Sequence, residues 1–254
     1  IRTVLIWSLV KWRPRIKFEW PIAKVILAYG KDIAMSSALA IFFLNIDNAF
    51  ISRLLGTSQL GYYTLAFLFA TLPVLFAQRV VDTVSFPAYT QVREQKQTLI
   101  NAYLKSLRII ATFVLPTNLG LLAIAPVLVP VLYGDKWQPS IILIQILSLY
   151  GLIRAMSNAP TNVLLAIGRQ YLFPRFALLY LSLAVLALGP AIYWYGTIGA
   201  AVAMTLVIWV MGLTWFLLTD HYLAIPFNKI IQTIAPQVLA ALFMLGSVRF
   251  SAIY

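Results

Sequence analysis

The sequence predicts an all-α fold, a polytopic transmembrane helical bundle, from three observations. Apolar residues make up 62% of the 254 residues, and charged residues only 10%. A water-soluble domain of this length cannot bury so much apolar surface. Apolar runs long enough to cross a bilayer recur along almost the whole chain, and basic residues concentrate in every second gap between these runs.

Seven segments are expected to cross the membrane. A helix rises about 1.5 Å per residue, so about 20 mainly apolar residues cross the hydrocarbon core. Residues 1–10 are apolar but too few to cross, and we expect them to be the last turns of an earlier helix. The expected spans, in chain order, are Asp32–Leu55, Gly61–Tyr89, Leu107–Tyr133, Ser140–Ile167, Leu172–Trp194, Ile198–Thr219 and Ile231–Tyr254.

The gaps between these spans alternate in charge, as the positive-inside rule requires. The gaps with little or no charge, expected outside the cell, are Gly56–Leu60, Gly134–Pro139 and Tyr195–Thr197. The gaps expected in the cytoplasm contain Lys11, Arg13, Arg15, Lys17 and Lys24, then Arg93, Lys96, Lys105 and Arg108, then Arg169 and Arg175, and finally Lys229. The topology is therefore regular, with Arg249 as a mild exception.

Two parts are expected in the chain. Residues 1–30 are expected to hold the end of a preceding span and a cytoplasmic linker, and residues 31–254 the bundle. The chain has neither an initial Met nor the layout of a signal peptide, so we expect a part of a longer protein. Phe18–Tyr29 and Glu94–Leu107 have amphipathic patterns typical of helices at the membrane surface. An extension of the neighbouring span explains Glu94–Leu107 equally well.

The composition excludes several functions. The net charge is +12, but the basic residues lie in short loops beside apolar runs, so we expect no nucleic-acid partner. Cysteine is absent and His221 is the only histidine, so thiolate chemistry, His-based metal sites and His-based triads are not expected. We therefore predict no catalytic residue, no metal site and no cofactor.

Polar residues within the predicted spans are the candidate functional residues, because a charge inside the bilayer normally faces a cavity or a partner. Asp47 lies about 22 Å along its helix from Asp32 at 1.5 Å per residue, with Asn45 and Asn48 beside it. Three polar side chains within one turn cannot all face lipid. This pattern is compatible with a proton- or cation-sensitive site, with an inter-helix contact that changes during transport, or with a buried hydrogen bond that holds two helices together.

Arg79 and Asp82 lie three residues apart on one helix face, where the two side chains are able to neutralise each other. Arg154 has no acidic residue three or four positions away, and Ser157, Asn158 and Asn162 follow on overlapping faces. Its guanidinium therefore needs either a carboxylate from another helix, such as Asp47, or an anionic substrate such as a phosphate. Arg53 lies near the outer surface and is expected to be an anchor.

Several stretches resemble the polysaccharide exporters and oligosaccharide flippases of the multidrug/oligosaccharidyl-lipid/polysaccharide superfamily. The stretches that carry the resemblance are "NIDNAFISRLLGTSQLGYYTLA" from Asn45, "SFPAYTQ" from Ser85, "APVLVPVLYGDKWQPS" from Ala125, "LLAIGRQ" from Leu164 and the linker "KWRPRIKF" from Lys11. No single stretch is decisive, but their order and spacing are fairly specific and cover nearly the whole chain.

This resemblance implies one lobe, of about six to seven spans, of a two-lobe transporter in the bacterial inner (plasma) membrane. Its partners would be membrane lipids, a first lobe of the same protein and a lipid-linked oligosaccharide, which crosses by alternating access. Arg79, Arg154 and Asn158 are candidates for substrate binding. Asp47, Asn45, Asn48 and Asp82 are candidates for the cavity or for coupling to a proton or sodium gradient.

Three other functions are compatible with parts of the sequence. A cation-coupled multidrug antiporter of the same superfamily would use Asp47, although Arg79 and Arg154 disfavour cationic drugs. A membrane sugar-lipid polymerase would need a large outer loop or an acidic cluster, and the sequence has neither. We therefore expect no enzyme. A structural membrane scaffold would have no cavity.

Overall fold

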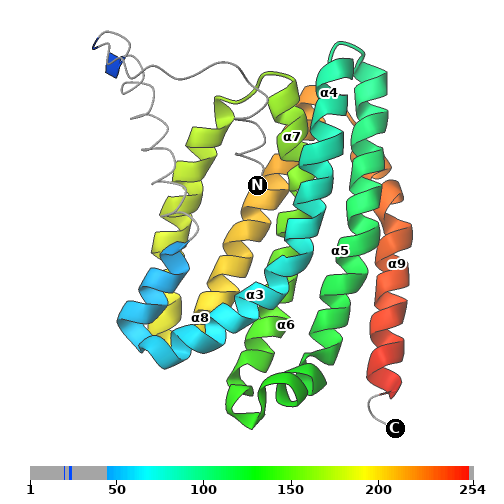
Figure 1. Ribbon diagram of the computed structural model, residues 1–254. Helices are drawn as coiled ribbons and strands as arrows, with labels where there is room; N and C mark the ends of the chain where they lie inside the picture. The colour runs from blue at the N-terminus through cyan, green and yellow to red at the C-terminus, as the bar shows by residue number, and fades with distance from the viewer. Residues whose placement is uncertain (1–19, 21–22, 25–44, 252–254) are drawn as a thin grey trace, which may run out of the picture. The chain divides into compact units, whose positions relative to one another are not determined.

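The computed structural model describes residues 20, 23–24 and 45–251 (Figure 1). The chain divides into two compact units, Ile1–Leu44 and Asn45–Tyr254. Most of the predicted linker, the amphipathic segment Phe18–Tyr29 and the first part of the span Asp32–Leu55 lie outside the described residues. The architecture described below is that of the second unit.

The described part of the second unit is built from helices. Residues 45–55 are helical, and no strand occurs in the described part of the chain. The all-α prediction is therefore confirmed. The elements that follow are α3 (Thr57–Val80), the π-helical turn η1 (Val81–Ser85), α4 (Phe86–Val92), α5 (Lys96–Tyr133), the 3-10 turn η2 (Asp135–Trp137), α6 (Pro139–Met156), α7 (Asn158–Ala166), α8 (Leu172–Leu223) and α9 (Phe227–Ser251).

Within the described residues, five helical segments are long and apolar enough to cross a membrane. One of them, α8, contains two of the predicted spans, because Gly196 has non-helical angles (φ 58°, ψ −138°) and divides it into two arms. Glycine tolerates this positive φ without the steric penalty that a Cβ brings. The predicted turn at Tyr195–Thr197 is thus found at its expected place.

Glu94–Leu107 does not form a separate surface helix. α5 begins at Lys96 and continues without a break to Tyr133. Leu99, Tyr103 and Leu107 are almost completely buried, so their apolar face packs into the bundle instead of lying on lipid. The alternative expectation, an extension of the span, is the one that the structure supports.

Proline explains two interruptions of the helices. Pro87 has no backbone N–H and crowds the preceding turn, and the π-helical turn Val81–Ser85 lies directly before it. Pro160 acts in the same way just after Ser157, where α6 gives way to α7. Both interruptions lie in the half of each span toward the Arg93–Gln95 end of the bundle.

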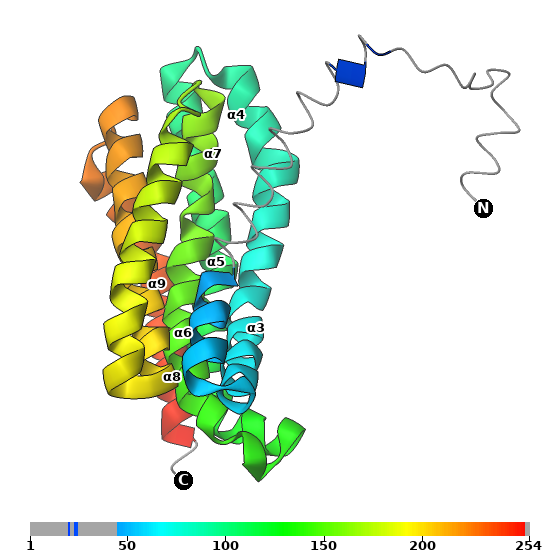
Figure 2. The same ribbon diagram turned by 90° about the vertical axis from the view of Figure 1, so that its left-hand side faces the viewer.

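α6 is the central helix of the unit. It contacts α3, α5 and α8, and two glycines allow close approach. A Cβ at Gly151 would collide with the backbone carbonyl of Ala70 on α3, and one at Gly212 on α8 would approach Ile153 within 2.6 Å. The connections between helices alternate between the two ends of the bundle, with Arg93–Gln95 at one end and Gly134–Gln138 at the other (Figure 2).

Candidate functional site

Asp47 is a buried acid inside the bundle, with only 2% of its surface exposed. The hydroxyl of Tyr63 on α3 donates a 2.8 Å hydrogen bond to Oδ2 of Asp47, and the backbone N–H of Asn48 donates to Oδ1 over 2.9 Å. Asp47 precedes the turn at Gly56 by about 13 Å of helix. This carboxylate is therefore enclosed by protein groups at membrane depth.

Aromatic rings continue from Tyr63 to the central helix. The ring of Tyr63 stacks on Phe67 with centroids 6.1 Å apart, and Phe67 lies 5.4 Å from the ring of Tyr150 on α6. Tyr63 and Tyr150 are buried. The hydroxyls of Tyr63 and Tyr150 are thus buried among apolar side chains, the first beside Asp47 and the second beside Arg154.

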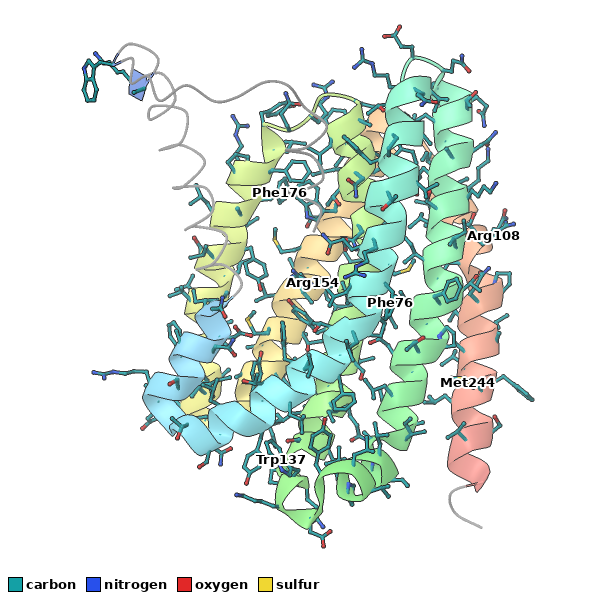
Figure 3. The ribbon with its side chains drawn as sticks, viewed as in Figure 1. Phe76, Arg108, Trp137, Arg154, Phe176 and Met244 are labelled. Carbon is teal, nitrogen blue, oxygen red and sulfur yellow. The ribbon has the colours of Figure 1, made fainter. Side chains whose placement is uncertain are left out.

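Arg154 lies one helical turn beyond Tyr150, near the middle of the bundle's height (Figure 3). Its Nη1 donates to the Tyr150 hydroxyl over 3.0 Å, and its guanidinium lies 5.8 Å from the Tyr150 ring centroid. Tyr180 on α8 is buried close to both residues, and Asp47 interacts electrostatically with Arg154. We call Asp47, Tyr63, Tyr150, Arg154 and Tyr180 the buried charge cluster.

Arg154 and Asp47 do not form a salt bridge. Among the side chains that the structure describes, the one ion pair within 4.0 Å joins Arg93 and Glu94. The hydrogen bond of Arg154 goes to a hydroxyl on its own helix and not to a carboxylate from another helix. The cluster therefore holds a guanidinium, which has five N–H donors, and a carboxyl group inside the bundle without a direct ion pair between them.

The other predicted site residues are more dispersed. Asn48 donates to Asn45 over 3.3 Å, so these two amides bond to each other beside Asp47. The Nδ2 of Asn158 is buried and has no hydrogen-bond partner among the described residues. Arg79 is exposed on α3, and no described contact links it to the cluster, while the side chain of Asp82 is outside what the structure describes. Arg53 is exposed, as an anchor would be.

Sequence reasoning missed the role of the tyrosines. Aromatic residues near the ends of predicted spans are expected to be anchors at the membrane interface, and Tyr62, Tyr63, Trp137, Trp194 and Tyr195 occupy such positions. This expectation is wrong for Tyr63, which is 0% exposed, whereas Trp194 and Tyr195 are 71% and 72% exposed. The position of Tyr150, four residues before Arg154, was the available signal for the partner of that arginine.

A second group of buried hydroxyls lies on α4, α5 and η1 and was not predicted. Ser106 donates to Ser85 over 3.0 Å, and the hydroxyls of Tyr89 and Tyr103 have no well-formed hydrogen bond to the described residues. Asp220, near the end of α8, interacts electrostatically with Tyr103. No group of three potential metal-ligating side chains occurs in the part of the chain that the structure describes.

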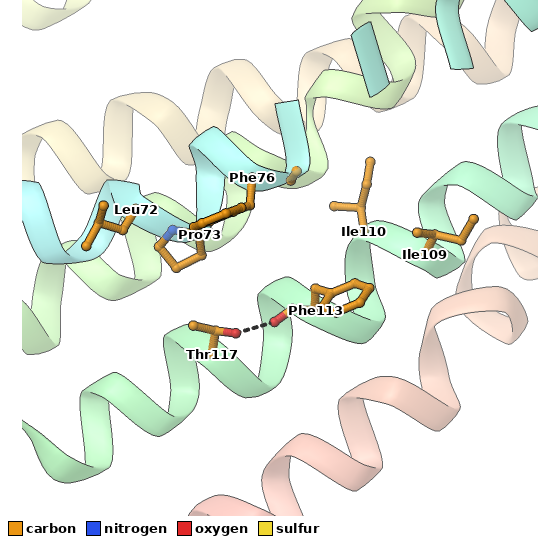
Figure 4. Close-up of a pocket in the computed structure, with 8 residues that line it drawn as sticks. Leu72, Pro73, Phe76, Ile109, Ile110, Phe113 and Thr117 are labelled. Atoms are coloured by element: carbon orange, nitrogen blue, oxygen red, sulfur yellow. Dashed lines mark hydrogen bonds between the residues drawn. The ribbon is translucent and has the colours of Figure 1, made fainter. Parts of the chain in front are cut away.

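An apolar groove, lined by none of the cluster residues, lies between α3 and α5 (Figure 4). Its volume is about 460 Å³. Leu72, Pro73 and Phe76 form one wall, and Ile109, Phe113 and Thr117 belong to the other. Such a surface suits lipid chains and offers no recognition of a polar group.

The fold and its buried charges define a multi-pass membrane protein. The sequence profile of the polysaccharide biosynthesis protein family matches residues 1–142, and the chain belongs to this family. No solved structure matches the chain.

Three curated relatives are similar to parts of the chain. The teichuronic acid biosynthesis protein TuaB of Bacillus subtilis (strain 168) is 27% identical over 65% of this chain and 35% of its own length. The lipopolysaccharide biosynthesis protein WzxC of Escherichia coli (strain K12) is 26% identical over 77% of this chain and 39% of its own length. The succinoglycan biosynthesis transport protein ExoT of Rhizobium meliloti (strain 1021) is 32% identical over 34% of this chain and 18% of its own length. The chain thus spans well under half the length of these relatives.

Proposed function

We propose that this chain is the second lobe of a flippase that moves lipid-diphosphate-linked oligosaccharide across the bacterial plasma membrane by alternating access. The observation that carries the proposal is Arg154, a guanidinium inside a transmembrane bundle that is hydrogen-bonded to the hydroxyl of Tyr150. A cation kept at membrane depth, with no described carboxylate in direct contact, is suited to an anion that enters the membrane protein.

The energetics of the substrate explain why such a residue is useful. A sugar diphosphate loses its hydration in hydrocarbon, which is costly unless protein groups replace the water. Guanidinium binds phosphate oxygens through two parallel N–H bonds. A polar chamber between this lobe and a first lobe would carry the headgroup, while the polyprenyl tail stays in the membrane or in an apolar groove such as the one between α3 and α5.

The names of the relatives support a carbohydrate substrate. They refer to teichuronic acid, lipopolysaccharide and succinoglycan, and one relative is described as a transport protein. In this proposal the protein transports and does not catalyse, and it uses no cofactor. A proton or sodium gradient would drive the movement of the lobes, with Asp47 as the group that binds the ion and Asp82 as the other candidate.

The test is transport by the full-length protein in liposomes that contain a fluorescent lipid-diphosphate-linked oligosaccharide. Replacing a charge-assisted hydrogen bond in Arg154→Gln is expected to lower the flipping rate by about tenfold or more. The matched control is Arg53→Gln, which removes an exposed charge and is expected to leave the rate unchanged.

Three results would overturn the proposal. An unchanged rate for Arg154→Gln would remove Arg154 from the mechanism. Export of cationic drugs that depends on Asp47 and is indifferent to Arg154 would instead establish the drug antiporter. Incubation of the same liposomes with lipid-linked sugar and analysis of product length tests the polymerase, for which longer glycans would be the signature.

A further inference from the structure

Two tyrosines connect distant parts of the chain at one end of α8. The hydroxyls of Tyr171, directly before α8, and Tyr222, near its end, lie 3.2 Å apart although the residues are 51 positions apart in sequence. This contact closes the α8 hairpin at the end opposite Gly196. It also presents two aromatic rings to the surface, since Tyr171 is exposed and Tyr222 half-buried.

A guanidinium group lies over each of these two rings. The Cζ of Arg169 lies 4.5 Å from the centroid of the Tyr222 ring, and the Cζ of Arg175 lies 5.7 Å from that of the Tyr171 ring. Nη1 of Arg169 also donates to the Tyr171 hydroxyl over a long 3.4 Å. Stacking on a ring engages the face of a guanidinium and leaves the N–H groups at its edge free to bind. We call Arg169, Tyr171, Arg175 and Tyr222 the Arg–Tyr platform.

The two arginines of the platform make no ion pair with a described carboxylate, although Glu94 lines a pocket beside Gly168 and Asp220 lies two residues before Tyr222. Among the described side chains, neither Arg169 nor Arg175 has a carboxylate oxygen within 4.0 Å, whereas Arg93 on the neighbouring loop is paired with Glu94 at 3.8 Å. Two cations fixed close to each other without a carboxylate raise the local potential, and they favour an anion that can bridge them.

The platform lies at the depth of lipid headgroups. The first arm of α8, Leu172–Tyr195, is about 36 Å long at 1.5 Å per residue, which is close to the thickness of the bilayer. Phe173 and Phe176 pack on Trp215 with centroids 5.0 Å and 4.6 Å apart, an aromatic group typical of the interface. Figure 3 shows Phe176 toward the same end of α8.

Apolar side chains continue from the platform toward the middle of the membrane. Leu178 and Leu179 lie three and four residues after Arg175 on the same helix, which places them one turn deeper, and they are 68% and 45% exposed. A ligand on this surface therefore meets cations at the interface and open hydrocarbon-facing leucines below. That order of polarities fits an amphiphile with a phosphate and an acyl chain, and not a soluble anion or an acidic peptide.

We propose that the Arg–Tyr platform binds the phosphate headgroup of an anionic phospholipid in the cytoplasmic leaflet. The basic loops place this end of the bundle in the cytoplasm, where anionic headgroups concentrate. The guanidinium edges bind the phosphate oxygens, and the acyl chain lies along Leu178 and Leu179. This site does not depend on transport of an oligosaccharide.

The experiment is native mass spectrometry of the purified full-length protein, titrated with phosphatidylglycerol or with phosphatidylethanolamine. The wild type is expected to retain phosphatidylglycerol preferentially. The double variant Arg169→Gln/Arg175→Gln is expected to lower its affinity for phosphatidylglycerol by about tenfold, because each basic residue near the surface contributes to anionic lipid binding. The matched control is Arg53→Gln/Lys136→Gln, which removes two exposed charges at the other end and is expected to bind like the wild type.

A second variant separates binding from folding. Tyr171→Phe/Tyr222→Phe keeps both rings and both cations but removes the hydroxyl contact, so it is expected to retain most of the preference for phosphatidylglycerol even if the thermal midpoint falls. The proposal would be overturned if the affinity for phosphatidylglycerol fell equally in Arg169→Gln/Arg175→Gln and in its matched control. An unchanged affinity in Arg169→Gln/Arg175→Gln would overturn it as well. The proposal would also be overturned if the protein did not prefer phosphatidylglycerol to phosphatidylethanolamine but bound a polyprenyl diphosphate at the platform. That result would assign the site to the transported lipid.

Discussion

The hydroxyl of Tyr63 donates a 2.8 Å hydrogen bond to the carboxylate of Asp47, sixteen residues earlier, and both side chains are buried. The contact joins the helix of residues 45–55 to α3 across the turn at Gly56. It gives a buried acid a donor at a depth where water is scarce. The hydroxyl of Tyr63 is therefore expected to contribute to the stability of this helix pair.

Replacing Tyr63 by Phe tests that dependence. The variant keeps the ring but leaves a buried carboxylate oxygen with one donor fewer, so the free energy of unfolding is expected to fall by about 1–3 kcal/mol. Unfolding in mixed detergent micelles, followed by tryptophan fluorescence, measures the change. Tyr62→Phe is the matched control, because Tyr62 is half-buried and contacts Trp137 through its ring. Similar losses in the two variants would argue against a special role of the Tyr63 hydroxyl.

Asp47 and Arg154 are expected to be energetically coupled although they do not touch. Asp47→Asn leaves the half-buried Arg154 without its nearby negative charge, and Arg154→Gln leaves the acid without its nearby positive charge. The double variant should therefore be less destabilised than the sum of the single variants, by about 0.5–3 kcal/mol. A double-mutant cycle on the unfolding free energies measures this difference, and strict additivity would show that the two charges act independently.

The helices pack so closely at Gly151 that even one added methyl group is expected to destabilise the protein. Gly151→Ala forces a Cβ against the carbonyl of Ala70 and should destabilise the protein by about 1–3 kcal/mol through overpacking. Gly189→Ala in α8 is the control, since a methyl group there would meet no other atom within 4 Å, and alanine should be neutral or stabilising by up to about 1 kcal/mol. Thermal midpoints of the two variants give the comparison, and a stable Gly151→Ala protein would contradict the close contact.

The membrane topology is open to a direct labelling test because the chain contains no cysteine. Lys136→Cys and Gln170→Cys introduce exposed thiols at opposite ends of the bundle. A membrane-impermeant maleimide is expected to label Lys136→Cys in right-side-out membranes and Gln170→Cys in inside-out vesicles, as the positive-inside rule predicts. The reversed pattern would invert the orientation and would place the Arg–Tyr platform outside the cell.

Much of the fold was predictable because lipid imposes simple requirements on length and polarity. Runs of about 20 apolar residues, with basic residues concentrated in alternate gaps, predicted the order of the described spans. The turn at Gly196 followed from the uncharged gap around it. By contrast, the continuation of α5 through Glu94–Leu107 depended on packing against other helices, and its amphipathic pattern alone suits both a surface helix and a buried extension.

The candidate site was predictable in its charges and not in its partners. Asp47 and Arg154 stand out because ionisable residues are rare within spans. Tyr62 and Tyr63 are adjacent aromatic residues about 100° apart on a helix, and only the packing of α3 decides which one points inward. The exposure of Arg79 was not predictable for the same reason. When a helix has no strongly apolar face, its sequence does not indicate which side faces the bundle.

The close contacts of α6 also limit how the unit is able to move. α6 meets three neighbours at once, and at Gly151 and Gly212 no spare space separates the helices. Sliding α6 along its axis would drive side chains into backbone atoms, and densely packed interiors resist such gradual deformation. Any large displacement of α6 therefore carries α3, α5 and α8 with it, and the freedom to change shape lies in the bends at Val81–Ser85 and Ser157 and at the periphery.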